Sequence, residues 1–234
     1  MILQPVRARR RRVLIDIDTQ MDFMLATGKA CIRNHRRILT HIRRLMAWAR
    51  YNNISIISIA QVYPNTGTDL DTHCCIDGTD GQKKIRYTLL NDRISFPADG
   101  STDFPRDILR CYSQVILHKR TVDPFQEPRI DRLLSELRAS EFMLFGATAE
   151  GAVMATALGL LQREKKVTIV VDAVGSQNTK ESRLAIRKME AKGARLIETK
   201  KLVGDSHLRH VGICSCKLCR GGVKDSPIQV GVEY

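Results

Sequence analysis

The stretch LFGATAEGAVMATALGLL, residues 144–161, decides the fold of this chain. It continues the apolar run EFMLFGA (141–147), which suits a buried strand, and passes directly into a helix of small residues near 150–163. A strand that turns straight into a helix presents the backbone N–H groups of the first helical turn to an anion or oxyanion. We therefore expect a ligand site at this turn.

The same alternation of strand and helix runs through most of the chain, apart from a poorly patterned middle near 85–112. Strands are expected at 12–18, 54–63, 113–119, 141–147, 166–174 and 194–199, and helices at 35–53, 128–139, 150–163 and 179–192. This order predicts an α/β fold whose mainly parallel sheet is covered by helices on both faces. The predicted organisation is a basic arm (1–11), one domain (12–203) and a short Cys/His-rich C-terminal extension (204–234).

Composition predicts a soluble, basic protein. The 234 residues are 43% hydrophobic, and no stretch reaches the ~18 apolar residues that cross a bilayer, so no membrane partner is expected. Asp16 and Asp18 interrupt the only signal-like run, and the seven cysteines do not suggest a disulfide framework, so a cytoplasmic location is expected. The net charge of +13 leaves two interpretations open, a solvated basic face or a nucleic-acid partner.

Three groups stand where predicted strands end. Asp18 and Lys119 each close a strand, and the turn at 147–153 follows a third. Ligands of parallel α/β sheets bind beyond the carboxyl ends of the strands, so these groups are expected to converge. The carboxylate would move protons, while the ammonium and the helix amides would hold an anion. Each group alone is also explained as a surface ion pair or a helix cap.

The contexts of these groups resemble one family in their order along the chain. LIDIDTQMDF contains D-x-Q-x-D-F at 18–23, VILHKRTVDPF ends a strand in lysine, and CIDGTDG (75–81) is similar to a C-x-x-G-T-x-G segment. With the turn at 146–153, which resembles G-x-x-T-x-x-C-V, these motifs are similar to those of the isochorismatase-like (cysteine hydrolase) superfamily. The resemblance covers about residues 12–200 and implies a three-layer α/β/α sandwich, usually a homo-oligomer.

The resemblance also implies a site. Asp18 would be the base, Lys119 its support, and Ala152 falls on the position of the nucleophilic cysteine. The substrate-binding positions carried over are Gln20, Phe23, Gln61, Phe125, Thr148 and Gly151. A methyl group has neither lone pair nor proton, so a covalent intermediate at position 152 is excluded. The expected ligand is a small molecule, anionic because of the lysine.

The metal positions of the nicotinamidase branch also differ. Its D-x-H segment corresponds to Gln61-Val62-Tyr63, and Cys74 occupies its histidine position, with His73 one residue away. We therefore expect no catalytic metal and no nicotinamidase activity. Isochorismatases proper hydrolyse a vinyl ether by proton transfer from the aspartate, without that thiol. Three readings remain open: Asp18 acid–base chemistry, a pseudoenzyme that binds a small molecule or nucleic acid, and an engineered alanine.

The C-terminal extension contains a candidate structural zinc site. HLRHVGICSCKLCRGG (207–222) brings thiols and imidazoles within a few residues of one another. The expected ligands are Cys214, Cys216, Cys219 and His210, with His210 preferred to His207. A reduced tail without metal is the alternative reading.

Overall fold

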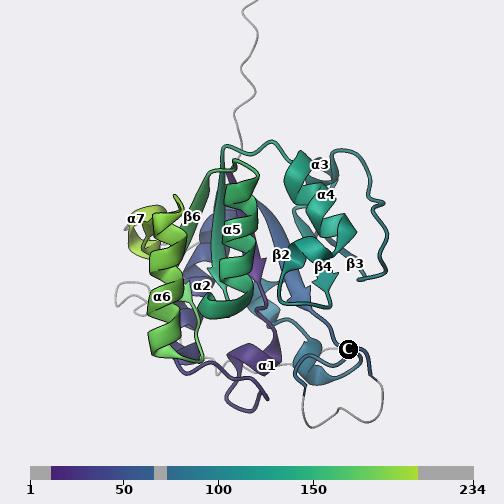
Figure 1. The fold of residues 1–234 in the computed structure, drawn as a ribbon. Coiled ribbons are helices and arrows are strands. Elements are labelled where there is room, and N and C mark those ends of the chain that lie inside the picture. Colours follow the sequence, from purple (N-terminus) through teal and green to yellow (C-terminus); the bar gives the residue numbers. More distant parts are fainter. Residues whose placement is uncertain (1–11, 66–72, 205–234) are drawn as a thin grey trace, which may run out of the picture.

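The computed structural model describes residues 12–65 and 73–204, and its centre is a seven-stranded sheet (Figure 1). The strand order is β3-β4-β2-β1-β5-β6-β7, and every neighbouring pair is parallel. The strands are β1 (Arg12–Ile17), β2 (Ser55–Gln61), β3 (Arg93–Phe96), β4 (Gln114–Lys119), β5 (Glu141–Gly146), β6 (Val167–Val174) and β7 (Arg195–Ile197). The predicted α/β class is confirmed, and the sheet is parallel throughout these strands.

Helices cover both faces of this sheet and make three layers. The α-helices are α1 (Met21–Met24), α2 (His35–Tyr51), α3 (Ile108–Cys111), α4 (Pro128–Glu136), α5 (Met154–Gln162), α6 (Thr179–Ala191) and α7 (Thr199–Val203). Shorter turns are η1 (Asp80–Gln82), η2 (Arg86–Thr88), η3 (Pro124–Gln126) and η4 (Ala149–Val153). Helices α4, α5 and α6 contribute to the core on one face, and α2 and α7 to the core on the other (Figure 1).

The sequence of β1 explains why it belongs to both cores. Successive side chains of a strand point to opposite faces. Val13, Ile15 and Ile17 accordingly pack with α4 and α5, whereas Leu14 packs with α2. A strand that is buried on both faces has a near-continuous apolar sequence, and β1 and β2 show one that is interrupted by Asp16 in β1 and by the serines and the terminal glutamine of β2.

Two expectations about local structure differ from what is observed. The poorly patterned middle contains the edge strand β3 and the short helix α3. Because β3 is only four residues long and half exposed, its alternation is too short to read from sequence. The helix expected at 150–163 begins at Met154, because Gly151 has a non-helical backbone (φ −115°, ψ −113°) inside η4.

Within the described residues, no helix combines the length and apolar composition that crossing a membrane requires. The basic arm and all of the C-terminal extension except Gly204 lie outside the described residues, so the expectations about them stay predictions.

Candidate active site

The carboxyl ends of β1, β2 and β4 bring three polar side chains together. These strands are neighbours and run in the same direction, so Asp18, Gln61 and Lys119 end at one edge of the sheet. Asp18 follows β1 with a left-handed backbone (φ 47°), a conformation that aspartate tolerates better than most residues. Its N–H still donates to Ile59 O at 2.8 Å, so the sheet holds the residue in place.

Asp18 and Lys119 form a buried ion pair. The distance from Lys119 Nζ to Asp18 Oδ2 is 2.9 Å, and Nζ also donates to Gln61 Oε1 at 2.5 Å. Asp18 is 3% exposed and Lys119 is 1% exposed. Burial raises the pKa of Asp18, and the charge and hydrogen bond of Lys119 oppose this rise without cancelling it. A carboxyl group with a raised pKa can give or take a proton nearer neutral pH than an ordinary aspartate.

Two atoms of this cluster are left with unused hydrogen-bonding capacity. Asp18 Oδ1, an acceptor, and Gln61 Nε2, a donor, are buried and have no hydrogen-bond partner among the described residues. A buried polar atom without a partner costs roughly 1–3 kcal/mol, so such atoms are few in a folded protein. The cluster therefore offers a bound molecule one acceptor and one donor beside a lysine.

Gln20 holds the end of β2 in place. Its side chain accepts from the Gln61 N–H (2.8 Å) and donates to Gln61 O (2.7 Å) and to Gln82 O (2.8 Å). These three bonds occupy its amide, so Gln20 contacts the site through the backbone of Gln61. Its predicted role in substrate binding stays a prediction, and what the structure adds is this positioning role.

The turn after β5 lies against β1. Gly146 has φ 121°, and a Cβ there would lie 1.9 Å from Ile17 O, so only glycine fits. Ala147 N–H donates to Ile17 O at 2.9 Å, one residue before Asp18. Thr148 and Gly151 are half-buried within this turn, and Ala152 is 4% exposed. The structure thus places these three predicted site residues in a turn joined to the strand that carries Asp18, while their roles stay predictions.

The two predicted aromatic positions are engaged in packing. Phe23 of α1 belongs to the core that includes α2. Phe125 of η3 packs against α5, where a Cβ on Gly159 would lie 2.1 Å from its ring, and Arg163 lies over that ring at 3.9 Å. Phe23 and Phe125 therefore both pack against the hydrophobic core, and a contact of either ring with substrate stays a prediction.

A second buried ion pair lies close to the first and was not anticipated from sequence. Lys84 Nζ is 2.6 Å from Asp16 Oδ2 and donates to Thr19 Oγ1 at 2.6 Å. Thr19 Oγ1 and Ser58 Oγ donate to the two oxygens of Asp16. Since Asp16 and Thr19 lie on either side of Asp18 in the chain, this network fixes the segment that carries it. Asp16 could be seen in the sequence, but no motif or regular spacing indicated that Lys84 is its partner.

The loop before η1 contains two adjacent cysteines, Cys74 and Cys75. Cys75 is buried, and its N–H donates to Asp22 Oδ2 at 2.6 Å, which ties the loop to α1. A hydrogen bond between the two thiols, together with burial, raises the pKa of Cys75, and the same bond lowers the pKa of Cys74. Cys74 is therefore the more acidic thiol of the pair.

The nicotinamidase metal positions hold a different donor set here. Gln61 Oε1 accepts from Lys119, and burial, followed by the charges of Cys74 and Asp18, raises the pKa of Tyr63. An amide already in use and a protonated phenol do not fit a site built for aspartate and histidine ligands. That the chain needs no catalytic metal stays a prediction. The predicted zinc ligands, which are Cys214, Cys216, Cys219 and His210, lie outside the described residues.

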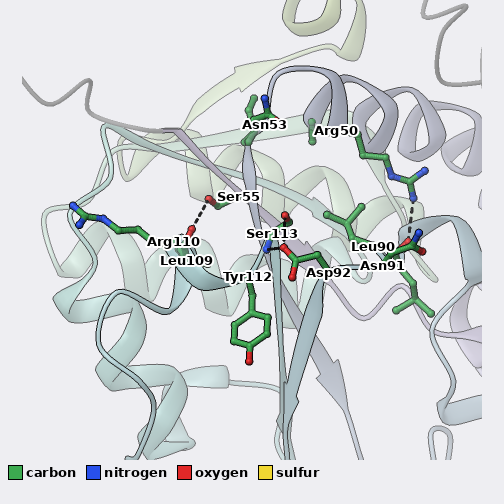
Figure 2. Close-up of a pocket in the computed structure, with 13 residues that line it drawn as sticks. Arg50, Asn53, Ser55, Leu90, Asn91, Asp92, Leu109, Arg110, Tyr112 and Ser113 are labelled. Atoms are coloured by element: carbon green, nitrogen blue, oxygen red, sulfur yellow. Dashed lines mark hydrogen bonds between the residues drawn. The ribbon is translucent and has the colours of Figure 1, made fainter.

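An open cavity of about 480 Å³ lies at the opposite, amino edge of the sheet (Figure 2). Its polar side chains largely bind one another. Asp92 Oδ2 accepts from the N–H and Oγ of Ser113, and Arg50 donates to the carbonyls of Tyr87 and Leu89. With no buried polar atom left unpaired among its lining residues, this cavity is a weaker candidate than the Asp18 cluster.

Comparisons with known proteins agree with this architecture. The isochorismatase family protein YaaI of Bacillus subtilis (strain 168) is 25% identical over 179 residues, which are 76% of this chain and 88% of YaaI. The structure of nicotinamidase/pyrazinamidase PncA from Bacillus subtilis matches with a TM-score of 0.63 at 19% identity, covering 80% of this chain and 100% of PncA. The MAR1 ribonuclease of Caenorhabditis elegans matches with a TM-score of 0.58 at 21% identity, covering 94% of this chain and 97% of that chain.

At such identities the two solved structures show a shared fold, which is the three-layer arrangement observed around the parallel sheet. The family follows from the sequence itself, because the family profile described as Isochorismatase domain matches residues 12–201 and so spans nearly all of the described chain. The resemblance first seen in the ordered motifs is thereby confirmed, and the chain belongs to the isochorismatase family.

Proposed function

We propose that this protein is a hydrolase that works by proton transfer at Asp18, without a nucleophile of its own. The observation that carries the proposal is the buried pair of Asp18 and Lys119, in which Asp18 Oδ1 has no partner among the described residues. A pKa raised by burial suits Asp18 to acid–base catalysis. We take Ala152 to occupy the nucleophile position of the family, where its methyl group can form no acyl intermediate.

The remaining groups suit a small anionic substrate. An ammonium group has three N–H donors, and Lys119 uses one on Asp18 and one on Gln61. The third would bind a negatively charged or developing oxygen, and Gln61 Nε2 would donate a second hydrogen bond. Asp18 Oδ1 would exchange the proton. In this arrangement Lys119 would both hold the substrate and oppose the rise that burial causes in the pKa of Asp18.

A substrate panel tests this proposal. Isochorismate-like vinyl ethers and small amides would be offered to the wild-type chain and to Asp18→Asn, which keeps the size of the side chain but cannot take up a proton. Turnover that falls by at least about 100-fold in Asp18→Asn is expected for the vinyl ethers, the range that general acid–base catalysis supplies. If no substrate shows Asp18-dependent turnover, the proposal fails.

Two further variants test the role of thiols. Cys74→Ser is expected to leave turnover unchanged, because no step of the proposed chemistry uses a thiol. Ala152→Cys is expected to add amide hydrolysis to the existing activity, since it supplies the nucleophile beside an intact base. Loss of wild-type activity in Cys74→Ser would instead assign the nucleophile to the loop and contradict the proposal.

A second candidate function is action on nucleic acid, either binding without turnover or strand cleavage. Two observations favour it. The net charge is +13, and the match to the MAR1 ribonuclease covers 94% of this chain, whereas the match to PncA covers 80%. The test is binding of a labelled oligonucleotide at low salt, where contacts to phosphates are strongest. Absence of binding under that condition excludes this candidate.

A further inference from the structure

The exposed basic residues of the α2 region gather at one edge of the molecule. Helix α2 contains five arginines and no acidic residue. Arg43 lies over the Tyr87 ring at 4.7 Å, and Arg50 donates to backbone carbonyls, so these two are engaged. The residues Lys29, Arg33, Arg36 and Arg37 are exposed at the start of the helix and in the loop before it. We call these four the basic rim.

The basic rim lies at the same edge of the sheet as Asp18. Asn34 donates to Val174 O, at the carboxyl end of β6, and accepts from Ser176 N–H. Backbone hydrogen bonds connect this segment to the active site. The N–H of Arg33 donates to Ser176 O, which joins the loop before α2 to the segment after β6. In the turn after β5, the Ala149 N–H donates to Gly175 O and the Ala147 N–H donates to Ile17 O. Ile17 directly precedes Asp18. The rim and the candidate active site are therefore joined by the turn that contains Thr148 and Gly151.

The charge of the rim is not neutralised within the described chain. The three arginines of the rim, Arg33, Arg36 and Arg37, form no salt bridge with a described residue. Asp22 accepts from the backbone N–H groups of Lys29 (3.1 Å) and Cys75 (2.6 Å). Two further acids lie in this network: Glu150 accepts from the N–H groups of Gln177 and Asn178, and Glu181 accepts from Asn178 Nδ2. One small anion needs only one such cation. Four exposed cations at the edge of the sheet that carries Asp18 suit a ligand with several phosphates.

We propose that the substrate of the Asp18 site is RNA, that the basic rim binds its phosphates, and that the 2′-hydroxyl of the RNA supplies the nucleophile that position 152 lacks. The inference rests on the proposed proton transfer at Asp18 and assigns RNA, in place of a small molecule, as its substrate. Among polynucleotides, only RNA carries a hydroxyl next to the phosphodiester. A catalyst with a base and a lysine, but without a nucleophile, therefore has all that RNA cleavage requires.

The proposed step balances without any other reactant. Asp18 takes the proton of the 2′-hydroxyl, and the 2′-oxygen forms a bond to the adjacent phosphorus. The bond from phosphorus to the 5′-oxygen breaks, and that oxygen takes a proton from Lys119. The proton then passes from Asp18 to Lys119 across the 2.9 Å contact, which restores both groups. The products are a 2′,3′-cyclic phosphate and a 5′-hydroxyl end.

Binding is tested with charge-matched variants. The rim variant Arg33→Gln/Arg36→Gln/Arg37→Gln removes three charges at the carboxyl edge. The control Arg110→Gln/Arg138→Gln/Lys192→Gln removes three exposed charges from segments that precede β4, β5 and β7, at the amino edge. The probe is a fluorescent single-stranded RNA of 20 nucleotides, titrated at several salt concentrations.

With a slope of about 0.7 per phosphate contact, the rim variant is expected to lower the salt dependence of log Kd by about 2 and to weaken binding about 100-fold at 0.1 M salt. The control is expected to stay close to wild type. Equal losses in both triple variants would mean non-specific attraction and would overturn the assignment of the rim.

Cleavage is tested with three oligonucleotides of one sequence: all-RNA, all-DNA, and RNA with one 2′-deoxy position. Wild-type protein should cut the RNA to cyclic-phosphate ends, spare the DNA and skip the deoxy position, and Asp18→Asn purified in parallel should be inactive. Cutting of DNA, or of RNA at the deoxy position, would overturn the 2′-hydroxyl mechanism. Asp18-dependent turnover of a small molecule without RNA cleavage would overturn this inference alone. Absence of both activities would overturn the proposed function as well.

Discussion

Loss of Lys84 is expected to destabilise the fold far more than loss of its neighbour Lys83. The Lys84 side chain is 5% exposed and lies 2.6 Å from Asp16, which is fully buried. Removing one partner of a buried pair leaves a buried charge uncompensated and costs about 3–5 kcal/mol. Lys83 pairs with Asp80 at 2.8 Å, but both side chains are largely solvated, at 49% and 75% exposure. An exposed pair contributes about 1 kcal/mol or less.

Urea unfolding of Lys84→Met and Lys83→Met measures this difference. The single tryptophan, Trp48, is 8% exposed and lies in the core that α2 forms with the sheet, so its fluorescence reports unfolding. The double variant Asp16→Asn/Lys84→Met is expected to recover part of the loss, because it removes the unpaired charge while the single amide oxygen still accepts from one of the two hydroxyl groups, that of Thr19 or that of Ser58. A Lys84→Met cost within about 1 kcal/mol of Lys83→Met would refute this account of the network.

Three other predictions concern the pair, the packing and the tail. The folded-state pKa of Asp18 is raised, so the contribution of Asp18 to stability is present at acid pH and is lost as the pH rises through that pKa. The free energy of unfolding of Asp18→Asn, relative to that of the wild type, should therefore increase above about pH 4. A difference between the two proteins that does not change with pH in urea titrations would contradict this. Gly159→Ala should cost about 1–3 kcal/mol in thermal unfolding, because a Cβ at 2.1 Å forces the Phe125 ring to move, and an unchanged Tm would show that the ring has room. Metal analysis of the purified chain should find about one equivalent of zinc, and less than about half would count against tetrahedral ligation by the predicted residues, Cys214, Cys216, Cys219 and His210.

Much of the fold could be predicted because burial in the core imposes a local pattern of apolar residues on each strand and helix. Buried parallel strands have near-continuous apolar sequences, and helices that cover them show apolar residues at helical spacing, so β1, β2 and α2 were visible in advance. The placement of Asp18 and Lys119 followed from one topological rule, since the carboxyl ends of parallel strands share an edge. That edge is where the structure joins them at 2.9 Å.

What could not be predicted depends on partners that are distant in sequence. Lys84 lies in a loop without periodicity, and nothing in the sequence marks Asp16 as its partner 68 residues away. The role of Gln20 in substrate binding stays a prediction, and no pattern in the sequence indicated that its amide bonds to backbone atoms of Gln61 and Gln82. Residue type shows what a side chain can bond, whereas the folded chain decides which of several partners it meets.

The cost of the Asp18 cluster is itself an argument that the cluster is used. Each buried ion carries a desolvation penalty of several kcal/mol, and replacing such a pair by apolar residues of similar volume is often neutral or stabilising. The cluster adds an acceptor on Asp18 and a donor on Gln61 that nothing in the described chain satisfies. The buried pair of Asp16 and Lys84 offers a contrast within the same molecule, because both oxygens of Asp16 are bonded, as a structural network requires. A chain that only needed to fold would gain by completing the bonds of Asp18 in the same way; the open acceptor next to Lys119 is what a base requires, and it does not depend on a thiol at position 152.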